Sequence, residues 1–269
     1  MIVIGEKLNS SIPSVYAAIE KKDSRFVSDL AVKQEEAGAH FLDINAGMFV
    51  EAEEENLRWL MNTVQAVSKL PLVIDTPDPS VALALAKEYR GEKPVINSVT
   101  LEENRFAPMV EAAKTCGAAM VALCMDDSGV PDGVERRIEL ANILTEKLRR
   151  EGFEPEDIYL DPMVRPVGSG EGYGLEAVQA IQGIRSNLPD VHIVCGLSNS
   201  SFGLPNRALI NRTFLTAAMI CADESWDSSY STTMLFFSRL TATCCAPGCL
   251  ATAFSTRLEQ AAQLMPVTS

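Results

Sequence analysis

Short apolar runs alternate with longer amphipathic stretches along most of the chain. The runs lie at residues 2–4, 41–44, 72–74, 95–96, 118–125, 158–160 and 191–197. Runs this short, each ending in a polar residue, are typical of the buried strands of a parallel sheet. The stretches between them have apolar residues at helical spacing and lie at residues 13–22, 25–37, 53–68, 79–89, 103–116, 133–150 and 174–187. The pattern therefore predicts a series of strand–helix units.

The regular alternation stops near Cys221. Successive strand–helix units with short connections favour a parallel sheet closed into a barrel over an open sheet. Residues 222–257 are instead rich in small hydroxylated side chains and show neither a helical period nor a clear eighth strand. We predict an α/β fold, a (β/α)8 TIM barrel with an atypical eighth strand and C-terminal region. The predicted domains are a barrel over residues 1–221 and a divergent segment over residues 222–269 that completes the barrel poorly.

Composition narrows the classes of partner and of chemistry. The chain has 269 residues, with 36 acidic and 23 basic side chains and a formal net charge of −13. Because this charge repels nucleic acid and anionic membrane surfaces, we expect neither as a partner. The 7 cysteines are odd in number and no apolar run approaches the ~18 residues of a membrane span, so we expect a soluble, cytoplasmic protein. With only 2 histidines, chemistry should rest on carboxylates and amides, and we expect no metal site.

Polar side chains follow the apolar runs. In a barrel of parallel strands the active site forms at the carboxyl ends of the strands, so these side chains are candidates for one site. The candidates are Glu6, Asp43, Asn45, Asp75, Asn97, Asp126, Asp127, Asp161 and Asn199. An ionised carboxylate accepts hydrogen bonds from an amino-pyrimidinone edge, while a carboxamide both donates and accepts. The set therefore suits a flat ligand rich in N–H donors and ring nitrogens, and a pterin is such a ligand.

A purely structural role competes with ligand binding at each of these positions. An Asp or Asn that ends a strand often caps the next helix or forms a turn with its own backbone. Asp43 and Asp78 suit that capping role. Asp75 and Asp161 each directly follow a buried apolar triplet, and we expect them to bind the ligand.

Several motifs occur in order and together resemble a known family. They are IGEKLN, LDINAG, VIDTPD, VINSV, YLDP, GLSNSSFGLPNR and INRTFL, all within residues 1–221. Each motif alone is weak, and the ordered set is specific. The chain resembles the pterin-binding methyltransferase family, which includes methyltetrahydrofolate:corrinoid/iron–sulfur-protein methyltransferases and the folate domain of cobalamin-dependent methionine synthase.

The resemblance implies a fold, a reaction and a set of site residues. A (β/α)8 barrel would hold the pterin of tetrahydrofolate, and a separate corrinoid (cobalamin) protein would present its cobalt. The reaction would be transfer of a methyl group between N5 of tetrahydrofolate and that cobalt, by a homodimer. The motifs match Asp75, Asn97 and Asp161 to the pterin edge, Asn199 to the catalytic amide that contacts N5, and Glu6 and Arg207 to further folate contacts.

Two other functions remain open from the sequence. A dihydropteroate synthase shares the barrel and the pterin mouth, but it must bind a pyrophosphate leaving group, for which we expect a basic pair near the last strands. Arg239 and Arg257 lie in no convincing motif. The other function is an inactive pterin-binding barrel that serves as a carrier or assembly partner.

The resemblance ends abruptly after Cys221. It implies a Gly-Leu-Asp segment and an eighth strand at this point, whereas the chain continues Ala222-Asp223-Glu224-Ser225-Trp226. A shifted reading frame in the gene would produce such a change, and we state this as a hypothesis. The site residues all lie upstream of the change.

Overall fold

The computed structural model describes residues 2–222, 231–235, 240–244 and 252–254, the last three ranges as backbone only. The chain divides into two compact units. The first comprises Met1–Pro131, Leu140–Leu160 and Asp190–His192, and the second comprises Asp132–Glu139, Asp161–Pro189 and Ile193–Ser269. Each unit is described by itself.

The first unit is built on a sheet whose strands follow the order of the chain. The strands are β1 (Ile4–Asn9), β2 (Phe41–Asn45), β3 (Leu72–Asp75), β4 (Val95–Val99), β5 (Ala119–Leu123), β6 (Ile158–Asp161) and β7 (His192–Ile193). The pairs from β1 to β5 are parallel. Parallel pairing in chain order places the carboxyl ends of these strands at one edge of the sheet.

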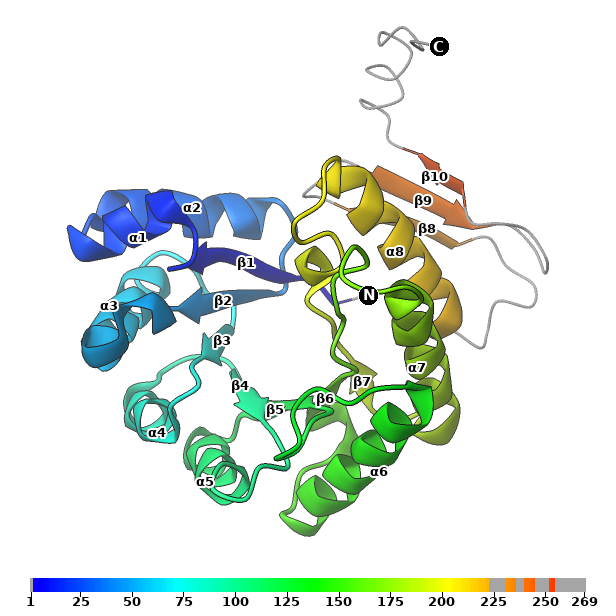
Figure 1. The fold of residues 1–269 in the computed structure, drawn as a ribbon. Helices are drawn as coiled ribbons and strands as arrows, with labels where there is room; N and C mark the ends of the chain where they lie inside the picture. Colours follow the sequence, from blue (N-terminus) through cyan, green and yellow to red (C-terminus); the bar gives the residue numbers. More distant parts are fainter. Residues whose placement is uncertain (1, 223–230, 236–239, 245–251, 255–269) are drawn as a thin grey trace, which may run out of the picture. The chain divides into compact units, whose positions relative to one another are not determined.

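Helices cover the outer face of β1 to β5 in this unit (Figure 1). They are α1 (Pro13–Glu20), α2 (Ser24–Glu36), α3 (Glu53–Gln65), α4 (Pro79–Glu88), α5 (Phe106–Cys116) and α6 (Val134–Arg150), with short 3-10 helices η1 (Gly47–Ala52) and η2 (Pro155–Asp157). Pro79 occupies the first turn of α4, and the Asp78 side chain accepts a hydrogen bond from the Ser80 N–H at 2.8 Å. Gly117 ends α5 in the left-handed region, which glycine adopts without steric cost. The strand residues Leu42, Ile74 and Ile96 are fully buried between sheet and helices.

The second unit has a separate apolar core between two helices. It contains α7 (Tyr173–Asn187), the 3-10 helix η3 (Leu197–Asn199) and α8 (Arg207–Ala222). Its core consists of Val164, Ala177, Ile181, Phe214 and Ala218. The strands β8 (Ser231–Leu235), β9 (Leu240–Cys244) and β10 (Thr252–Phe254) form an antiparallel sheet of their own.

This architecture confirms the predicted α/β fold class with its atypical C-terminal region. Within the described residues, 7 strands form the main sheet, and the first strand after α8 pairs in the separate 3-stranded sheet. Apart from those three strands, the segment 223–269 lies outside the described residues, as do Arg239 and Arg257. No helix among the described residues has the length and apolar character needed to cross a membrane.

Three local expectations were wrong or incomplete. The first strand continues through Asn9, so Glu6 lies inside β1 and does not follow it. The seventh strand is only two residues long, and the GLSN segment enters η3 instead. The helical pattern of α8 was not recognised from the sequence.

Candidate functional site

Three of the candidate side chains lie next to one another at the carboxyl edge of the first unit's sheet. Asn45 ends β2 and pairs in register with Asp75, which ends β3. Asp75 in turn pairs with Asn97 of β4. The register thus brings two residues predicted for the pterin edge, Asp75 and Asn97, onto neighbouring strands.

Hydrogen bonds fix the orientation of the Asn45 amide against Asp75. The Asn45 Nδ2 donates to Asp75 Oδ2 at 2.9 Å. Its Oδ1 accepts from the Ser10 hydroxyl and from the Gly47 N–H, both at 3.0 Å. Because both ends of the amide are engaged, Asp75 is held in one position by a neighbouring strand.

Burial makes Asp75 a weaker acid than an exposed aspartate. Desolvation raises its pKa from 3.8 to about 6, against the hydrogen bond from Asn45, which lowers it. The Glu53 carboxylate raises the pKa further and the Arg105 guanidinium lowers it. Glu53 is itself buried at the start of α3 and accepts a hydrogen bond from the Thr76 hydroxyl at 2.6 Å. Asp75 is therefore a partly buried carboxyl with charges of both signs nearby. Because its pKa is about 6, it is ionised at neutral pH.

Asp43 belongs to the same cluster, contrary to the capping role expected for it. It is 4% exposed in the middle of β2, and the following 3-10 helix has no side-chain cap. Burial raises its pKa well above 3.8, the charges of Asp75 and Glu6 raise it further, and a hydrogen bond with the Asn97 side chain lowers it. Asp78, by contrast, caps α4 as predicted.

These interactions place Glu6 in the same group. Its side chain is exposed on β1, and its charge acts on Asp43. The first unit therefore brings together three of the predicted site residues, Glu6, Asp75 and Asn97, with Asp43 and Asn45 between them.

In the second unit, a glycine connects Asp161 with Asn199. The Gly196 N–H donates a hydrogen bond to the Asp161 carboxylate, and the Gly196 carbonyl accepts from the Asn199 N–H at 3.0 Å. The side-chain Nδ2 of Asn199 lies so near that a Cβ at position 196 would approach it to 2.8 Å. The two hydrogen bonds of Gly196 therefore join Asp161 and Asn199 into a second group.

Asp161 combines a turn role with an unusual acidity. Its Oδ1 accepts the Met163 N–H at 2.7 Å, which is the local turn contact expected of a structural Asp. Burial raises its pKa from 3.8 to about 6, while the N–H groups of Met163 and Gly196 and the charge of Arg137 lower it. Burial distinguishes Asp161 from an exposed turn residue, whose carboxyl water would solvate.

Asn199 is exposed on a turn that Arg207 holds in place. The Arg207 Nε donates to the Ser201 hydroxyl at 3.0 Å and its Nη2 donates to the Ser198 carbonyl at 2.9 Å. Ser200 and Ser201 are fully buried beneath the turn. Two donors of Arg207 are thus engaged within the chain, and its contact with folate stays a prediction.

Asp126 and Asp127 belong to a turn after β5. The Asp126 carboxylate accepts the Ser128 N–H at 3.0 Å and its hydroxyl at 2.5 Å, and Asp127 is exposed. This geometry is that of an Asx turn. Among the described residues, no group of three or more His, Cys, Asp or Glu side chains is arranged to hold a metal ion.

The sequence reasoning missed the charged partners of these carboxylates. Arg105 acts on Asp75 and Arg137 acts on Asp161. A signal for Arg137 was present, because the buried residues Leu140, Ala141 and Leu144 follow it at i+3, i+4 and i+7. No pattern in the chain marked Arg105.

Comparison with known proteins points to one family. The family model described as pterin binding enzyme matches residues 5–224. The chain is 40% identical over 229 residues to the methylcorrinoid:tetrahydrofolate methyltransferase of Eubacterium limosum, covering 84% of this chain and 83% of that protein. It is 31% identical over 242 residues to the methionine synthase of Mycobacterium leprae, covering 85% of this chain and 20% of that longer enzyme.

Solved structures agree in fold at low identity. The dihydropteroate synthase of Yersinia pestis, solved with a pterine–sulfa conjugate, matches with a TM-score of 0.62 at 17% identity, over 83% of this chain and 84% of that one. The dihydropteroate synthase of Xanthomonas albilineans matches with a TM-score of 0.57 at 21% identity, over 82% of each chain. These likenesses establish the fold alone, whereas the family model covers most of the sequence. The chain belongs to the pterin binding enzyme family.

Proposed function

We propose that this protein transfers a methyl group between N5 of tetrahydrofolate and the cobalt of a separate corrinoid protein. The observation that carries the proposal is the 40% identity to a methylcorrinoid:tetrahydrofolate methyltransferase, which extends over 84% of this chain and 83% of that enzyme. Such coverage spans most of that enzyme. The methionine synthase match, in contrast, spans a fifth of that enzyme, so this chain corresponds to one part of it.

The pterin edge of the folate would be recognised by carboxylates and amides. We assign this role to Asp75 and Asn97 in the first unit and to Asp161 in the second. Both carboxyls have a pKa near 6, so both are ionised acceptors at neutral pH. A hydrogen bond from a pterin N–H to an ionised carboxylate contributes about 1.5–3 kcal/mol, and it replaces solvation that burial has removed.

Asn199 would assist at N5, where the reacting methyl group is attached. When the methyl group leaves, the electron pair of the N5–methyl bond stays on N5, so a hydrogen bond or a proton donated to N5 stabilises the transition state more than the ground state. The Asn199 amide is exposed, and Gly196 leaves room for it. The amide can donate to N5 or order a water that does. When the methyl group moves from methyltetrahydrofolate to the corrinoid protein, the nucleophile would be the cobalt of that partner.

Glu6 and Arg207 are proposed as further folate contacts. Glu6 is exposed beside Asp43, and the Arg207 guanidinium holds the Asn199 turn, so each lies with one of the two groups of site residues. We also propose that residues 1–221 form the pterin-binding barrel and that the protein is a homodimer. Its mass in solution, measured by light scattering, tests the homodimer.

The experiment that tests the function uses the complete chain and two steps. In the first step the chain is titrated with methyltetrahydrofolate, and binding is measured by calorimetry. In the second step the complex is mixed with a corrinoid protein in the cobalt(I) state, and methyl transfer is measured by the absorbance of methyl–cobalt. We expect binding and then methyl transfer. Binding without transfer would favour a carrier, and absence of folate binding would overturn the proposal. In a separate assay, formation of dihydropteroate and pyrophosphate from a dihydropterin pyrophosphate and 4-aminobenzoate would favour a synthase.

The role of Asn199 gives a sharper form of this test. We expect Asn199→Ala to slow methyl transfer by about 100-fold or more, because the contact strengthens as charge develops on N5. Folate affinity should fall much less. Asn187→Ala, on an exposed asparagine at the end of α7, is the matched control and should leave both quantities unchanged. A loss of affinity with unchanged turnover would remove Asn199 from the reaction.

A further inference from the structure

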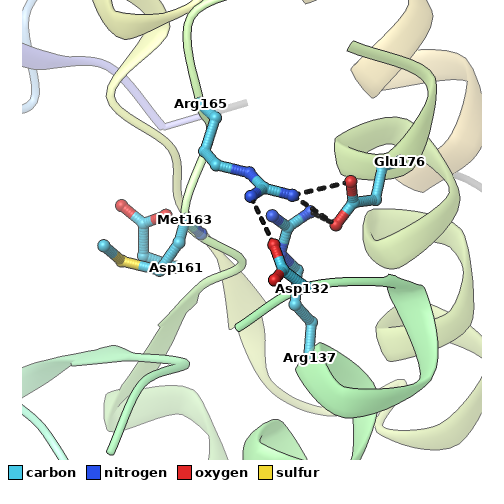
Figure 2. Close-up of polar contacts among 6 residues, drawn as sticks. All are labelled: Asp132, Arg137, Asp161, Met163, Arg165 and Glu176. Atoms are coloured by element: carbon cyan, nitrogen blue, oxygen red, sulfur yellow. Dashed lines mark hydrogen bonds and ion pairs between the residues drawn. The ribbon is translucent and has the colours of Figure 1, made fainter. Parts of the chain in front are cut away.

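Arg165, in the loop after β6, contacts three side chains of the second unit. Its Nη2 donates to both carboxylate oxygens of Glu176, at 2.9 and 2.8 Å, and its Nη1 donates to Asp132 at 2.7 Å (Figure 2). The guanidinium also lies over the ring of Tyr173, 3.7 Å from the ring centroid. One planar side chain is thus held both at its edge and on its face.

Burial shows which of these contacts hold Arg165 most firmly. The side chains of Arg165 and Glu176 are 18% and 17% exposed, whereas that of Asp132 is 94% exposed. Water screens the pair with Asp132, so that pair contributes little. Glu176 is also paired with the fully buried Arg137, whose Nη1 lies 3.1 Å from Glu176 Oε1. Arg165 is therefore held chiefly by Glu176 and Tyr173, both in the first turn of α7.

The other end of the same loop segment also lies against Tyr173. A Cβ at Gly170 would come within 2.4 Å of the Tyr173 ring, so the backbone of residue 170 is packed on that ring. Between the two ends, the Val167 side chain packs on Gly174, where a Cβ would approach it to 3.0 Å. We call residues 165–170 the strap. Its two ends and its middle all rest on the first turn of α7.

The strap also contacts the turn that carries Asn199. The Val167 N–H donates to the Ser200 carbonyl at 2.9 Å. A Cβ at Gly168 would approach the Leu204 side chain to 2.6 Å, so the two segments are in close contact there as well. Ser200 is fully buried and directly follows Asn199 in the chain. A series of direct contacts therefore leads from the first turn of α7, through the strap, to the residue next to Asn199.

We propose that Arg165 is a positioning residue for methyl transfer, which holds the strap on α7 and thereby keeps the Asn199 amide in place at N5. The inference rests on the proposed function, since that function gives Asn199 a reacting atom to contact. Arg165 touches neither the folate nor the methyl group in this scheme, and it acts only through the strap. A catalytic group must be held to within about 0.5 Å of its productive position, so a loosened strap slows the reaction.

A purely structural role for Arg165 predicts a different result. If Arg165 only ties the loop to α7, its loss lowers the stability of the unit and leaves methyl transfer unchanged in chains that stay folded. If Arg165 positions Asn199, its loss slows transfer at saturating folate, and this slowing disappears when Asn199 is already replaced. A structural role does not produce that dependence of one replacement on the other.

The test compares Arg165→Gln with a matched control, Arg58→Gln. Arg58 also joins two carboxylates, because its Nη2 donates to Glu54 at 2.6 Å and its Nε donates to Glu88 at 2.8 Å. It does so between α3 and α4, in the first unit. Each replacement removes one arginine and its two ion pairs. The two variants therefore differ in where the ion pairs lie.

Three quantities are measured on each variant of the complete chain. Calorimetry gives the affinity for methyltetrahydrofolate, and mixing with a cobalt(I) corrinoid protein gives the rate of methyl transfer at saturating folate. Mass spectrometry gives hydrogen exchange in peptides that cover residues 197–206. Tyr173→Leu and Tyr173→Phe form a second pair of variants, since only Phe keeps a ring beneath the guanidinium. Every variant is also combined with Asn199→Ala.

We expect Arg165→Gln to speed hydrogen exchange over residues 197–206 and to slow methyl transfer, each by about tenfold, as for the loss of one hydrogen bond. Folate affinity should change by less than about twofold. Combined with Asn199→Ala, Arg165→Gln should slow transfer by less than about twofold further. Tyr173→Leu should act in the same direction as Arg165→Gln, and more strongly than Tyr173→Phe. Arg58→Gln should leave both the exchange and the transfer rate as in the parent chain.

Two results for Arg165→Gln would overturn the inference. One is unchanged exchange over residues 197–206, and the other is an equal slowing of transfer with and without Asn199→Ala. The same changes in Arg58→Gln would also overturn it, because they would show a general loss of stability. If Arg165→Gln does not fold, the comparison of Tyr173→Leu with Tyr173→Phe decides the outcome by itself.

The exchange measurement needs no folate, so it separates this inference from the proposed function. If the parent chain transfers no methyl group but exchange responds as described, the proposed function fails and the fastening of the turn by Arg165 stands. If the parent chain transfers the methyl group and Arg165→Gln changes neither exchange nor rate, the inference alone fails.

Discussion

Neighbouring carboxyls in this molecule have opposite electrostatic environments. Asp75 is partly buried and its pKa is raised to about 6. Asp78, three residues further on, is exposed at the start of α4, where hydrogen bonds from Ser80 lower its pKa. A raised pKa means that the folded state disfavours the ionised form of the carboxyl. A ligand that donates hydrogen bonds to the carboxylate can compensate for this cost. A lowered pKa is the mark of a satisfied cap.

The difference predicts opposite pH dependences of stability. For Asp75 the folded chain binds more protons than the unfolded chain between pH 3.8 and about 6, so the free energy of unfolding falls as the pH rises through this window. Asp75→Asn should remove this pH dependence, which changes the free energy of unfolding by at most about 3 kcal/mol across the window. For Asp78 the contribution is present above the unfolded pKa and is lost as the pH falls. Urea unfolding across this pH range measures both.

The comparison with Asp78→Asn makes the measurement decisive. That variant should lose a small part of its stability at neutral pH and approach the parent chain in acid, because the Asn oxygen still accepts the capping hydrogen bond but lacks the charge that lowers the pKa of Asp78. Equal slopes in Asp75→Asn and the parent chain would show that Asp75 titrates as a solvated side chain. The buried position assigned to it would then be wrong.

The position of a site residue was predictable from the sequence where the residues next to it in the chain determine that position. Asp75 and Asn97 end apolar runs, and parallel pairing then puts them side by side. Asp43 was not predictable, since its neighbours Glu6 and Asn97 come from other strands and the register between strands is not written in any one segment. Arg137 was missed because α6 contains several arginines, and Arg137 differs from the others only in lying on the buried face of the helix.

At the scale of elements, the turn that carries Asn199 is fastened from two sides. Arg207, the first residue of α8, donates to Ser201 and to the Ser198 carbonyl. From the other side, the Val167 N–H donates to the Ser200 carbonyl at 2.9 Å. Gly168 lies so close to Leu204 that a Cβ there would approach the leucine side chain to 2.6 Å. The loop after β6 and the turn after β7 therefore support one another.

Loss of the Arg207 contacts should loosen this turn more than the rest of the unit. We expect Arg207→Ala to speed hydrogen exchange in peptides covering residues 197–206 by about tenfold, which corresponds to one lost hydrogen bond of about 1.5 kcal/mol. Methyl transfer should slow, because Asn199 is held less well. Arg185→Ala is the control, since Arg185 also donates to a backbone carbonyl, that of Pro189, at 2.6 Å. A large loss of folate affinity with unchanged exchange would show instead that Arg207 binds the ligand directly.

The elements with strong periodicity were predicted well. The helices α1 to α7 begin and end within a few residues of the expected stretches, because apolar spacing and Pro or Gly at their ends act locally. The limits of β1 were wrong for a tertiary reason. Glu6 and Lys7 are polar and exposed, yet they stay in the strand because Leu8 and Asn9 pair with Ile44 and Asn45 across a register irregularity.

At the scale of the whole molecule, the chain changes character at one point. The family model ends at residue 224, and α8 ends at Ala222. Beyond it, the described strands β8 to β10 pair antiparallel with one another. A (β/α)8 barrel requires a parallel eighth strand to satisfy the edges of its sheet. The rest of the family pattern therefore agrees with a barrel, whereas the last segment does not.

The reading-frame hypothesis explains this break and can be tested directly. A shift near the codon for Cys221 would leave residues 1–221 in the family pattern and replace all that follows, which matches the observed boundary. We expect that another frame of the same gene region encodes a Gly-Leu-Asp segment and an apolar strand. We also expect that the protein from the source cells lacks the tryptic peptide 213–239, which contains Trp226. Resequencing together with peptide mass spectrometry checks both points. Detection of that peptide would show that the segment is genuine, and the eighth strand would then have to be supplied by an unrelated sequence.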